Sequence, residues 1–231
     1  ASKGPDVFAV EADGTSRYED IADVYQRALV FVRVGERNGY LFDVFNVEGG
    51  LTHDWMLHSY ANEDPALKVS LPLRPTDGTM YEHITDLRQA TTDDSWQMTH
   101  TCEDGTALKT HMLGGADTSV LAGRCPSIRP APNDEARTHD YHMPIIAVRR
   151  EAQTEEPLSS TFAAIHEPYS EGEFITRVLS MPVEGSSEAV AVGVFLDQFT
   201  DYIIYTGPES SGARVSLEGI PITLEGRLAH V

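Results

Sequence analysis

The part of the sequence that decides the fold begins with Leu29-Val30-Phe31-Val32-Arg33-Val34 and returns as Tyr40-Leu41-Phe42-Asp43-Val44-Phe45-Asn46-Val47. Both stretches are rich in β-branched and aromatic residues that alternate at two-residue spacing, as in a β-strand. Between them, Gly35-Glu36-Arg37-Asn38-Gly39 favours a turn, and we expect Asn38-Gly39 to supply the positive φ that a hairpin needs. Glu48-Gly49-Gly50 then ends the second strand, so this region predicts an antiparallel hairpin.

The same alternation continues along the chain. A second hairpin is predicted from Trp96 to Leu113, with its turn at Asp104-Gly105 and with Trp96, Met98 and His100 on one face. Further strands are expected at 51–60, 145–148, 161–166, 174–179, 189–196, 201–205, 213–217 and 222–228. Helical periodicity is absent apart from one candidate turn at 18–25. We therefore predict an all-β protein, an antiparallel β-sandwich (supersandwich-like) with little helix.

The chain of 231 residues is expected to be one β-sandwich region, residues 1–231, within a larger protein. The segment 124–144 contains four prolines and few apolar residues, and predicts a long loop with a soft division there. The last ten residues, 222–231, have the pattern of a strand, a turn and the opening of another strand. Because an open sheet edge would be left unpaired, we expect further protein to cover it.

The charge excludes some partners. The chain has 36 acidic and 17 basic residues and a formal net charge of −19, so nucleic acid is not an expected partner. There is no apolar run of about 20 residues, and hence no expected membrane span. No signal peptide precedes Asp6, so a leader would have been removed or would lie on a longer precursor. Cys102 and Cys125 are either one candidate disulfide or two separate thiols.

The densest polar cluster is Thr52-His53-Asp54-Trp55-Met56-Leu57-His58. Metal binding, a His-Asp acid/base pair, and a sugar-binding surface with Trp55 as the stacking ring are three functional interpretations. On a regular strand His53 and His58 face opposite sides, and so do His53 and Asp54, which disfavours the first two. The structural alternative places Trp55 and Leu57 in the core with His53 at its edge.

Other polar residues also have more than one interpretation. The loop sequence His139-Asp140-Tyr141-His142 could hold a metal, but its histidines also fit a solvated loop, and no metal site is predicted. Asp43 lies inside an apolar strand and therefore needs a partner, for which Arg27 is the candidate. Tyr169, in Glu167-Pro168-Tyr169, is either a general acid or a core residue.

Several motifs, in order along the chain, resemble the heparinase II/III-like polysaccharide lyases. They are Tyr25-Gln26-Arg27-Ala28-Leu29, Tyr40 to Gly50, His53-Asp54-Trp55 with His58, Leu108 to Leu113, Cys125 to Pro130, Ser160 to Tyr169, and Gly226-Arg227-Leu228-Ala229. The resemblance extends from about residue 5 to the end of the chain. Each motif is short, and it is their succession that resembles the family.

The resemblance implies a role in β-elimination on uronic-acid-containing polysaccharides and a secreted or periplasmic location. It also implies an α/α toroid and further β segments of the same protein as partners. The family's H-x-H-x-D zinc motif and its Asn, His and Tyr catalytic groups do not occur here, so no catalytic residue and no cofactor are expected in this chain. Zinc would belong to the upstream part. The residues expected to contact an acidic polysaccharide are His53, Trp55, His58, Arg149, Arg150 and Tyr169. The alternative function is a non-catalytic carbohydrate-binding or extracellular assembly module.

Overall fold

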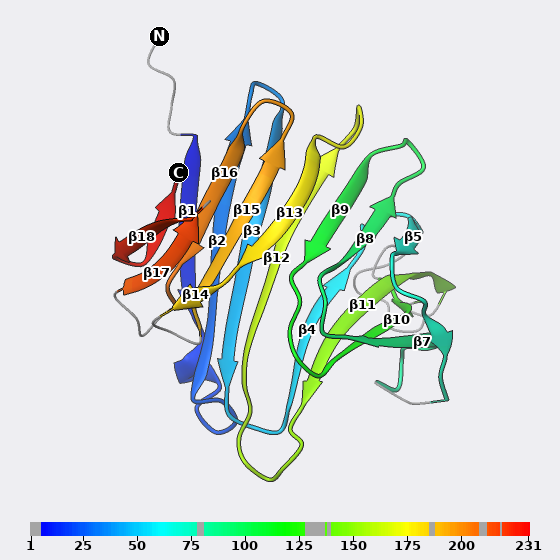
Figure 1. Ribbon diagram of the computed structural model, residues 1–231. Coiled ribbons are helices and arrows are strands. Elements are labelled where there is room, and N and C mark those ends of the chain that lie inside the picture. The colour runs from blue at the N-terminus through cyan, green and yellow to red at the C-terminus, as the bar shows by residue number, and fades with distance from the viewer. Residues whose placement is uncertain are drawn as a thin grey trace. The chain divides into compact units, whose positions relative to one another are not determined.

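The computed structural model describes residues 6–77, 81–127, 137, 140–184, 188–207, 212–217 and 219–231 (Figure 1). In these ranges antiparallel strands dominate, and 3-10 geometry is found at η1 (Thr15–Arg17) and at Arg137 and Asp140, which confirms the predicted all-β class. Within the same ranges, no helix has the length and apolar character needed to cross a membrane. Backbone contacts divide the chain into two units. The first unit comprises Ala1–Gly50, Glu156–Glu167 and Gly172–Val231, and the second comprises Leu51–Glu155 and Pro168–Glu171.

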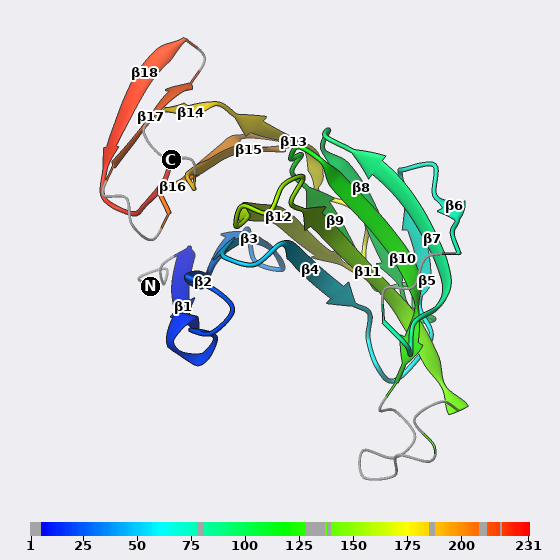
Figure 2. The same cartoon turned by 90° about the horizontal axis from the view of Figure 1, so that it is seen from below.

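The strands of the first unit form three groups. Neighbouring strands in the first group are β1 (Val7–Asp13), β2 (Val24–Val34), β3 (Asn38–Glu48) and β12 (Ser159–Tyr169). The second group is β13 (Ile175–Met181), β15 (Val190–Leu196), β16 (Thr200–Tyr205) and β19 (Leu228–His230). The third is β14 (Val183–Glu184), β17 (Gly212–Leu217) and β18 (Ile220–Glu225). Figure 2 shows the second group stacked over β2 and β3, as in a β-sandwich.

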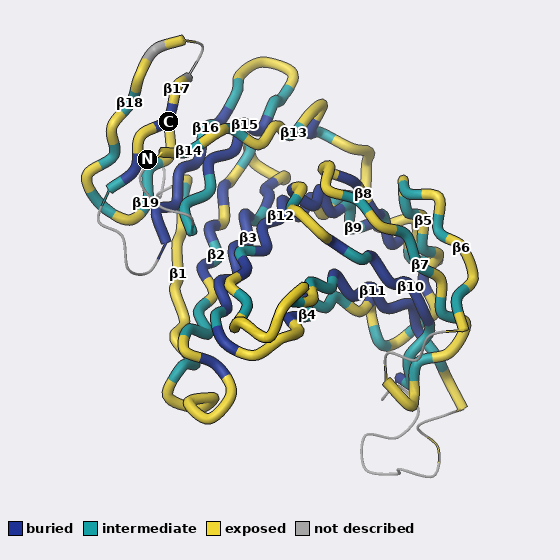
Figure 3. Tube along the Cα trace, turned by 60° about the horizontal axis from the view of Figure 1, so that its bottom comes forward, coloured by how far each residue is buried: buried dark blue, intermediate teal, exposed yellow. Residues whose placement is uncertain are grey.

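The predicted hairpin of β2 and β3 forms the centre of this unit. Val30 pairs with Phe42 and Val32 with Tyr40, and all four side chains are buried. Figure 3 shows buried, dark blue stretches along β2 and β3. Alternation thus places one face of the hairpin in the core. The turn lies at 35–37, within the predicted stretch, but the assignment of the positive φ to Asn38-Gly39 was wrong: Gly35 has the positive φ (65°), whereas Asn38 and Gly39 already belong to β3. Glycine is required at 39 for another reason, because a Cβ there would lie 2.6 Å from the ring of Phe31.

β12 pairs with β3 in antiparallel fashion, although the two strands lie far apart in the sequence. Leu41 is paired with His166 and Glu48 with Ser159. The Ser159 hydroxyl also donates a hydrogen bond to Glu48 across 111 sequence positions. The central strand β3 is therefore completed only by a strand that follows it at long range.

The second unit contains two groups of strands. The larger group has the order β4 (Thr52–His58), β11 (His142–Glu151), β10 (Thr118–Pro126), β7 (Thr85–Thr92) and β6 (Arg74–Pro75). The smaller group has the order β9 (Ala107–Met112), β8 (Trp96–Thr101) and β5 (Ala66–Val69). The predicted hairpin from 96 to 113 is confirmed as β8 and β9, with Gly105 in the turn at φ 85°. Buried residues come from both groups, among them Trp55 and Val148 from one and Trp96 and Met98 from the other.

The proline-rich stretch is more regular than expected at its start. β10 continues through Cys125 to Pro126, its last residue, where a missing N–H does little harm to the ladder. Residues 128–136 and 138–139 of the expected loop lie outside the described residues, and a soft division within 124–144 stays a prediction. The boundaries found by contacts lie instead at 50/51, 155/156, 167/168 and 171/172.

The candidate disulfide is not formed in this structure. Cys102 and Cys125 are free thiols, and both are half-buried. The thiol of Cys125 lies 3.7 Å from the carbonyl of Met143, and burial raises its pKa. Burial and the neighbouring Glu63 raise the pKa of Cys102. Each thiol therefore has its own environment, which corresponds to the second of the two alternatives.

Candidate functional site

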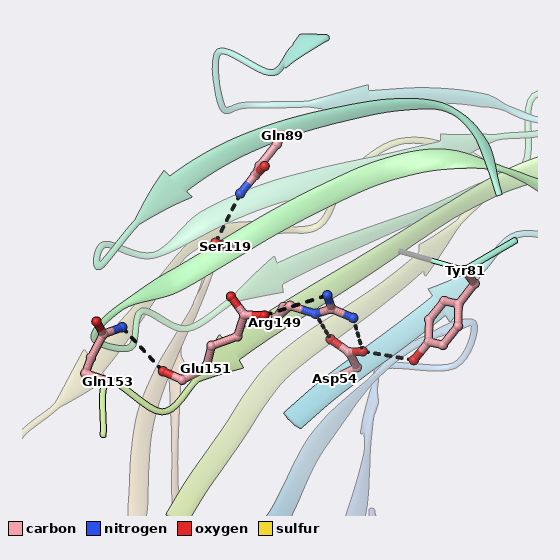
Figure 4. A network of polar contacts seen from close by, with 7 residues as sticks. All are labelled: Asp54, Tyr81, Gln89, Ser119, Arg149, Glu151 and Gln153. Carbon is pink, nitrogen blue, oxygen red and sulfur yellow. Dashed lines mark hydrogen bonds and ion pairs between the residues drawn. The ribbon is translucent and has the colours of Figure 1, made fainter. Parts of the chain in front are cut away.

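A polar cluster of the second unit lies where β4 pairs with β11. Asp54 and Arg149 are direct cross-strand partners, so their side chains emerge on the same face of the sheet. The guanidinium donates two hydrogen bonds to the carboxylate, from Nε to Oδ1 at 2.8 Å and from Nη2 to Oδ2 at 2.7 Å (Figure 4). Both side chains are largely buried, at 19% exposure for Arg149 and 11% for Asp54. This geometry is the planar, bidentate form of a carboxylate–guanidinium pair.

Other polar groups extend this pair across the sheet. The hydroxyl of Tyr81 donates to Asp54 at 2.9 Å, while about half of the Tyr81 side chain stays exposed. On the next strands, the Gln89 amide donates to the Ser119 hydroxyl at 3.3 Å, and Ser119 pairs directly with Arg149. We call Asp54, Tyr81, Gln89, Ser119 and Arg149 the Asp54–Arg149 face.

The protonation states on this face are fixed by the ion pair. The hydrogen bond with Asp54 raises the pKa of Arg149 and outweighs the opposite effect of its burial. Burial, followed by the hydrogen bond to Asp54, raises the pKa of Tyr81. The Tyr81 hydroxyl therefore stays protonated near pH 7 and donates a hydrogen bond to Asp54. It does not act as a base. The charge of Arg149 is neutralised by a carboxylate within hydrogen-bond distance.

The arrangement is suited to hydrogen bonding with a polar ligand. It offers a half-exposed tyrosine ring, an amide and a hydroxyl along one sheet face, which are groups that contact sugar rings and sugar hydroxyls. The carboxylate of Glu151, 3.9 Å from Arg149, adds negative charge at the edge. An acidic sugar would thus meet no uncompensated cation here. The Asp54–Arg149 face favours neutral hydroxyl contacts over binding of a carboxylate.

The predicted contact residues on β4 separate to two sides of the strand. His53 and Trp55 are buried, and Trp55 is only 2% exposed, so its ring cannot stack on a ligand in this structure. The proposed stacking role of Trp55 is wrong because strand alternation turns it into the core with His53. His58 points the other way and is exposed, with its Nδ1 2.9 Å from the carbonyl of Ser59. The expectation that His53 and His58 face opposite sides is confirmed.

Arg149 and Arg150 do not act as a pair. As neighbours on β11 they emerge on opposite faces, and Arg150 donates to the Thr118 hydroxyl at 3.3 Å. Burial lowers the pKa of Arg150, and its guanidinium occupies the space beside Gly115. Arg150 is thus half-buried, away from the Asp54–Arg149 face. Tyr169 ends β12 half-buried, and its role stays a prediction.

In the first unit, the predicted partnership of Asp43 with Arg27 is confirmed. The Asp43 carboxylate accepts two hydrogen bonds from Arg27, and His166 Nε2 lies 3.3 Å away. The sequence interpretation missed His166, because nothing in the alternation links residues 123 positions apart. No group of three or more His, Cys, Asp or Glu side chains with metal-binding geometry occurs within the described ranges. His139 of the loop motif lies outside those ranges.

Little in the sequence predicts the Asp54–Arg149 face. In the sequence Asp54 stands out only beside its neighbour His53, and Arg149 only beside Arg150. Tyr81 follows residues 78–80, which are not described, and lies in a stretch without alternation. One signal could have linked Asp54 to Arg149. Each is a charged residue in a largely apolar strand, where a charged side chain needs a partner of opposite charge.

The sequence matches no family model and no curated protein. Solved structures do match. A mutant of the heparan sulfate lyase HepC from Pedobacter heparinus has a TM-score of 0.55 at 11% identity, covering 90% of this chain and 27% of the lyase. HepC itself has a TM-score of 0.52 at 10% identity, covering 89% and 27%.

A heparinase III gene product gives the same picture, with a TM-score of 0.52 at 12% identity, covering 88% of this chain and 26% of that protein. The chain shares its fold with part of these lyases. It spans about a quarter of their length, 26–27%. At these identities the likeness concerns the fold.

Proposed function

We propose that this chain is the β-sandwich portion of a polysaccharide lyase that acts on uronic-acid-containing polymers. The observation that supports the proposal is the match of about nine-tenths of the chain, 88–90%, to a quarter of three lyase structures. The ordered succession of family-like motifs from Tyr25 to Ala229 supports it independently. In this proposal the chain supplies scaffold and part of the substrate-binding surface. Its location would be secreted or periplasmic, where such polymers occur.

The reaction of the whole enzyme would be a β-elimination. A base removes the proton at C5 of the uronate, and the electrons of that C–H bond form a C4–C5 double bond. The C4–O bond breaks, and its electrons leave with the glycosidic oxygen, which takes a proton from an acid. The uronate carboxylate must be neutralised for C5 to release its proton. On the Asp54–Arg149 face the arginine is already paired and the tyrosine is held neutral, so the groups for this step would come from further segments of the protein.

A second candidate function is a non-catalytic carbohydrate-binding module. The specific observation in its favour is the Asp54–Arg149 face, which offers hydrogen-bonding groups and a half-exposed tyrosine ring without a base. The two functions differ in what precedes the chain in the gene. A toroid-sized helical segment with an H-x-H-x-D motif upstream supports the lyase, and its absence from the intact gene supports the binding module.

Activity measurements on the chain test the proposal directly. Heparan sulfate and alginate are incubated with the purified chain, and unsaturated product is followed by ultraviolet absorbance. We expect no product, together with measurable retention of the chain on immobilised heparan sulfate. A steady rise in absorbance that disappears in His58→Ala would place the catalytic centre in this chain and overturn the proposal. Failure to bind any uronate polymer would remove the substrate-binding role.

A further inference from the structure

A groove of the second unit contains none of the residues of the Asp54–Arg149 face. It has a volume of about 950 Å³. One side is formed by residues 64–69 and 71–73, and the other by residues 86–88 and 122–124. These segments belong to β5 and its loops on one side and to β7 and β10 on the other. The volume falls within the range of about 300–1,000 Å³ that is usual for ligand sites.

The charge of this groove is opposite to that of the chain. Three cations, Lys68, Arg88 and Arg124, line it together with two carboxylates, Asp64 and Asp86. Arg124 is held by Asp64 and also lies 3.4 Å from the carbonyl of His142. Lys68 and Arg88 are exposed, and neither makes an ion pair with a described residue. In a chain with a net charge of −19, two unpaired cations in one groove are a local surplus of positive charge.

An irregularity in the strand pairing shapes this wall of the groove. Ala122 pairs with Arg88, but Arg124 pairs with Thr85, so β7 carries one extra residue opposite Gly123. Asp86, in this bulge, has a positive φ of 52°, which is unfavourable for a residue with a side chain. Gly123 is required opposite the bulge, because a Cβ there would lie 2.6 Å from the side chain of Ile84. Bulges of this kind redirect side chains and occur preferentially beside functional sites.

Apolar surface fills the space between the charges. Pro65, Leu71, Pro72, Leu73 and Pro75 line the groove with Leu87. Prolines fix the backbone φ of the loop that carries them, so less entropy is lost when a ligand binds. Flat apolar patches between spaced cations match a chain of sugar rings, whose C–H faces are apolar and whose acidic groups recur at intervals.

We infer that this groove binds a short segment of an acidic polysaccharide, with carboxylate or sulfate groups at Lys68 and Arg88 and ring faces against the prolines and leucines. Arg124, fixed by Asp64, forms the end of the cationic row. The inference goes beyond the proposed function, because a binding groove needs no lyase chemistry and shares no residue with the Asp54–Arg149 face. It adds a second polymer contact to the chain.

The test measures binding of a heparin-derived oligosaccharide by isothermal titration calorimetry. Lys68→Gln/Arg88→Gln removes two exposed cations from the groove, and we expect binding to weaken roughly five- to tenfold. Arg17→Gln/Arg33→Gln is the matched control, since it removes two exposed cations from the first unit and should change binding less than about twofold. Equal weakening in both double variants would mean unspecific attraction by net charge and would overturn the inference.

A second substitution removes a negative charge and is expected to tighten binding, which misfolding would not do. Asp86→Asn removes a carboxylate from the groove and keeps a residue type that tolerates positive φ, so we expect binding about two- to threefold tighter. Unchanged or weaker binding by Asp86→Asn contradicts the assignment. A polyglutamate peptide of the same charge is measured in parallel. Equal affinity and equal loss in the Lys68/Arg88 variant would identify an acidic-peptide site instead of a glycan site.

The outcomes separate this inference from the lyase proposal. If the Lys68/Arg88 variant binds normally while heparan sulfate retention persists, the groove assignment fails and the lyase assignment stands. If the groove binds as expected but the intact gene encodes no toroid segment, the lyase assignment fails and the groove assignment stands. Melting temperatures of all variants, expected to agree with the parent within a few degrees, show that each is folded.

Discussion

Arg27 and Asp43 face each other on neighbouring strands, with the guanidinium donating to both carboxylate oxygens at 2.7 and 2.6 Å. The carboxylate is 1% exposed and the arginine 43%, so a buried charge is held by a partner that reaches solvent. His166 approaches the same carboxylate from β12 at 3.3 Å. Burial alone would raise the pKa of Asp43, but the hydrogen bonds from His166 and Arg27 and their charges outweigh it and lower the pKa. Three strands of the sheet are thereby joined through one buried carboxylate.

Removing Arg27 alone should therefore lower the free energy of unfolding more than removing Arg27 and Asp43 together. In Arg27→Met the buried carboxylate loses both hydrogen bonds from the guanidinium, and we expect the free energy of unfolding to fall by about 2–3 kcal/mol, a figure reduced for the solvent exposure of Arg27. Arg27→Met/Asp43→Leu should lie closer to the parent, because no unpaired charge remains. Urea denaturation of the single and double variants measures the coupling. Strictly additive effects would contradict an interaction between the two residues.

His100 predicts a pH dependence of stability. Its ring is buried, and neither ring nitrogen has a hydrogen-bond partner among the described residues. Burial and then the nearby His58 lower the pKa of His100 from 6.5 to about 4. Between pH 6.5 and about pH 4, His100 is protonated in the unfolded chain but neutral in the folded chain. Stability therefore falls as the pH drops through this range and levels off below about 4.

The expected size of this effect is about 2 kcal/mol between about pH 7 and about pH 5. His100→Leu should lose this part of the pH dependence and keep or gain stability near neutral pH, because two unsatisfied polar atoms are replaced by an apolar group. Urea denaturation at the two pH values measures it. His83→Leu, at an exposed histidine, is the control and should retain the parental slope. Parallel slopes for His100→Leu and the parent would show that His100 does not contribute.

A third prediction concerns the hydrogen bond that joins β3 to β16. Tyr40 is fully buried and its hydroxyl donates to Asp201 at 2.7 Å. Burial, with the neighbouring carboxylate, strongly raises the pKa of Tyr40, so the phenol remains a donor throughout the pH range of folding. Tyr40→Phe should lower the free energy of unfolding by about 1–3 kcal/mol, since a buried acceptor loses a donor. Tyr60→Phe, at an exposed tyrosine, should change it by less than about 0.5 kcal/mol.

The Asp54–Arg149 pair predicts opposite effects on stability and on binding. Asp54→Asn removes the negative charge but keeps the size of the side chain, and leaves Arg149 with the more distant carboxylate of Glu151, 3.9 Å away. We expect a loss of stability of about 1–2 kcal/mol together with tighter retention on heparan sulfate. Tyr81→Phe is the control, because it removes one hydrogen bond to Asp54 without changing any charge. If Asp54→Asn binds heparan sulfate no more tightly than Tyr81→Phe, the polymer does not reach this face.

Much of the fold followed from alternation, and the failures have physical causes. The strands β2, β3, β8 and β9 were predicted because one face of each is apolar and the turns carry glycine. β1 and β7 were missed because most of their residues are exposed or half-buried on both faces, which leaves no alternation to detect. β10 was obscured by Pro126 and Cys125, which suggest a turn when read without their neighbours.

The candidate site was less predictable than the fold. Sequence neighbours such as His53 and Asp54, or Arg149 and Arg150, attracted attention as pairs, but a strand sends neighbours to opposite faces. The pairs that form, Asp54 with Arg149 and Asp43 with His166, are separated by 95 and 123 positions. The register between distant strands depends on the whole sheet, so it cannot be derived from the sequence of either strand. Asp43 with Arg27 was found because only 16 positions and one turn separate them.

The long-range pairing of β3 with β12 has a consequence for biosynthesis. The β2–β3 hairpin is synthesised before β12, and the strand that covers the free edge of β3 follows 111 or more residues later. At synthesis rates of about 5–20 residues per second, that edge waits on the order of ten seconds for its partner. During this time the apolar residues Phe42 and Val44 and the Asp43 carboxylate are still open to water. The nascent chain thus passes through a stage in which chaperone binding to β3 competes with aggregation, while β4 to β11, which are synthesised in between, can already pair among themselves.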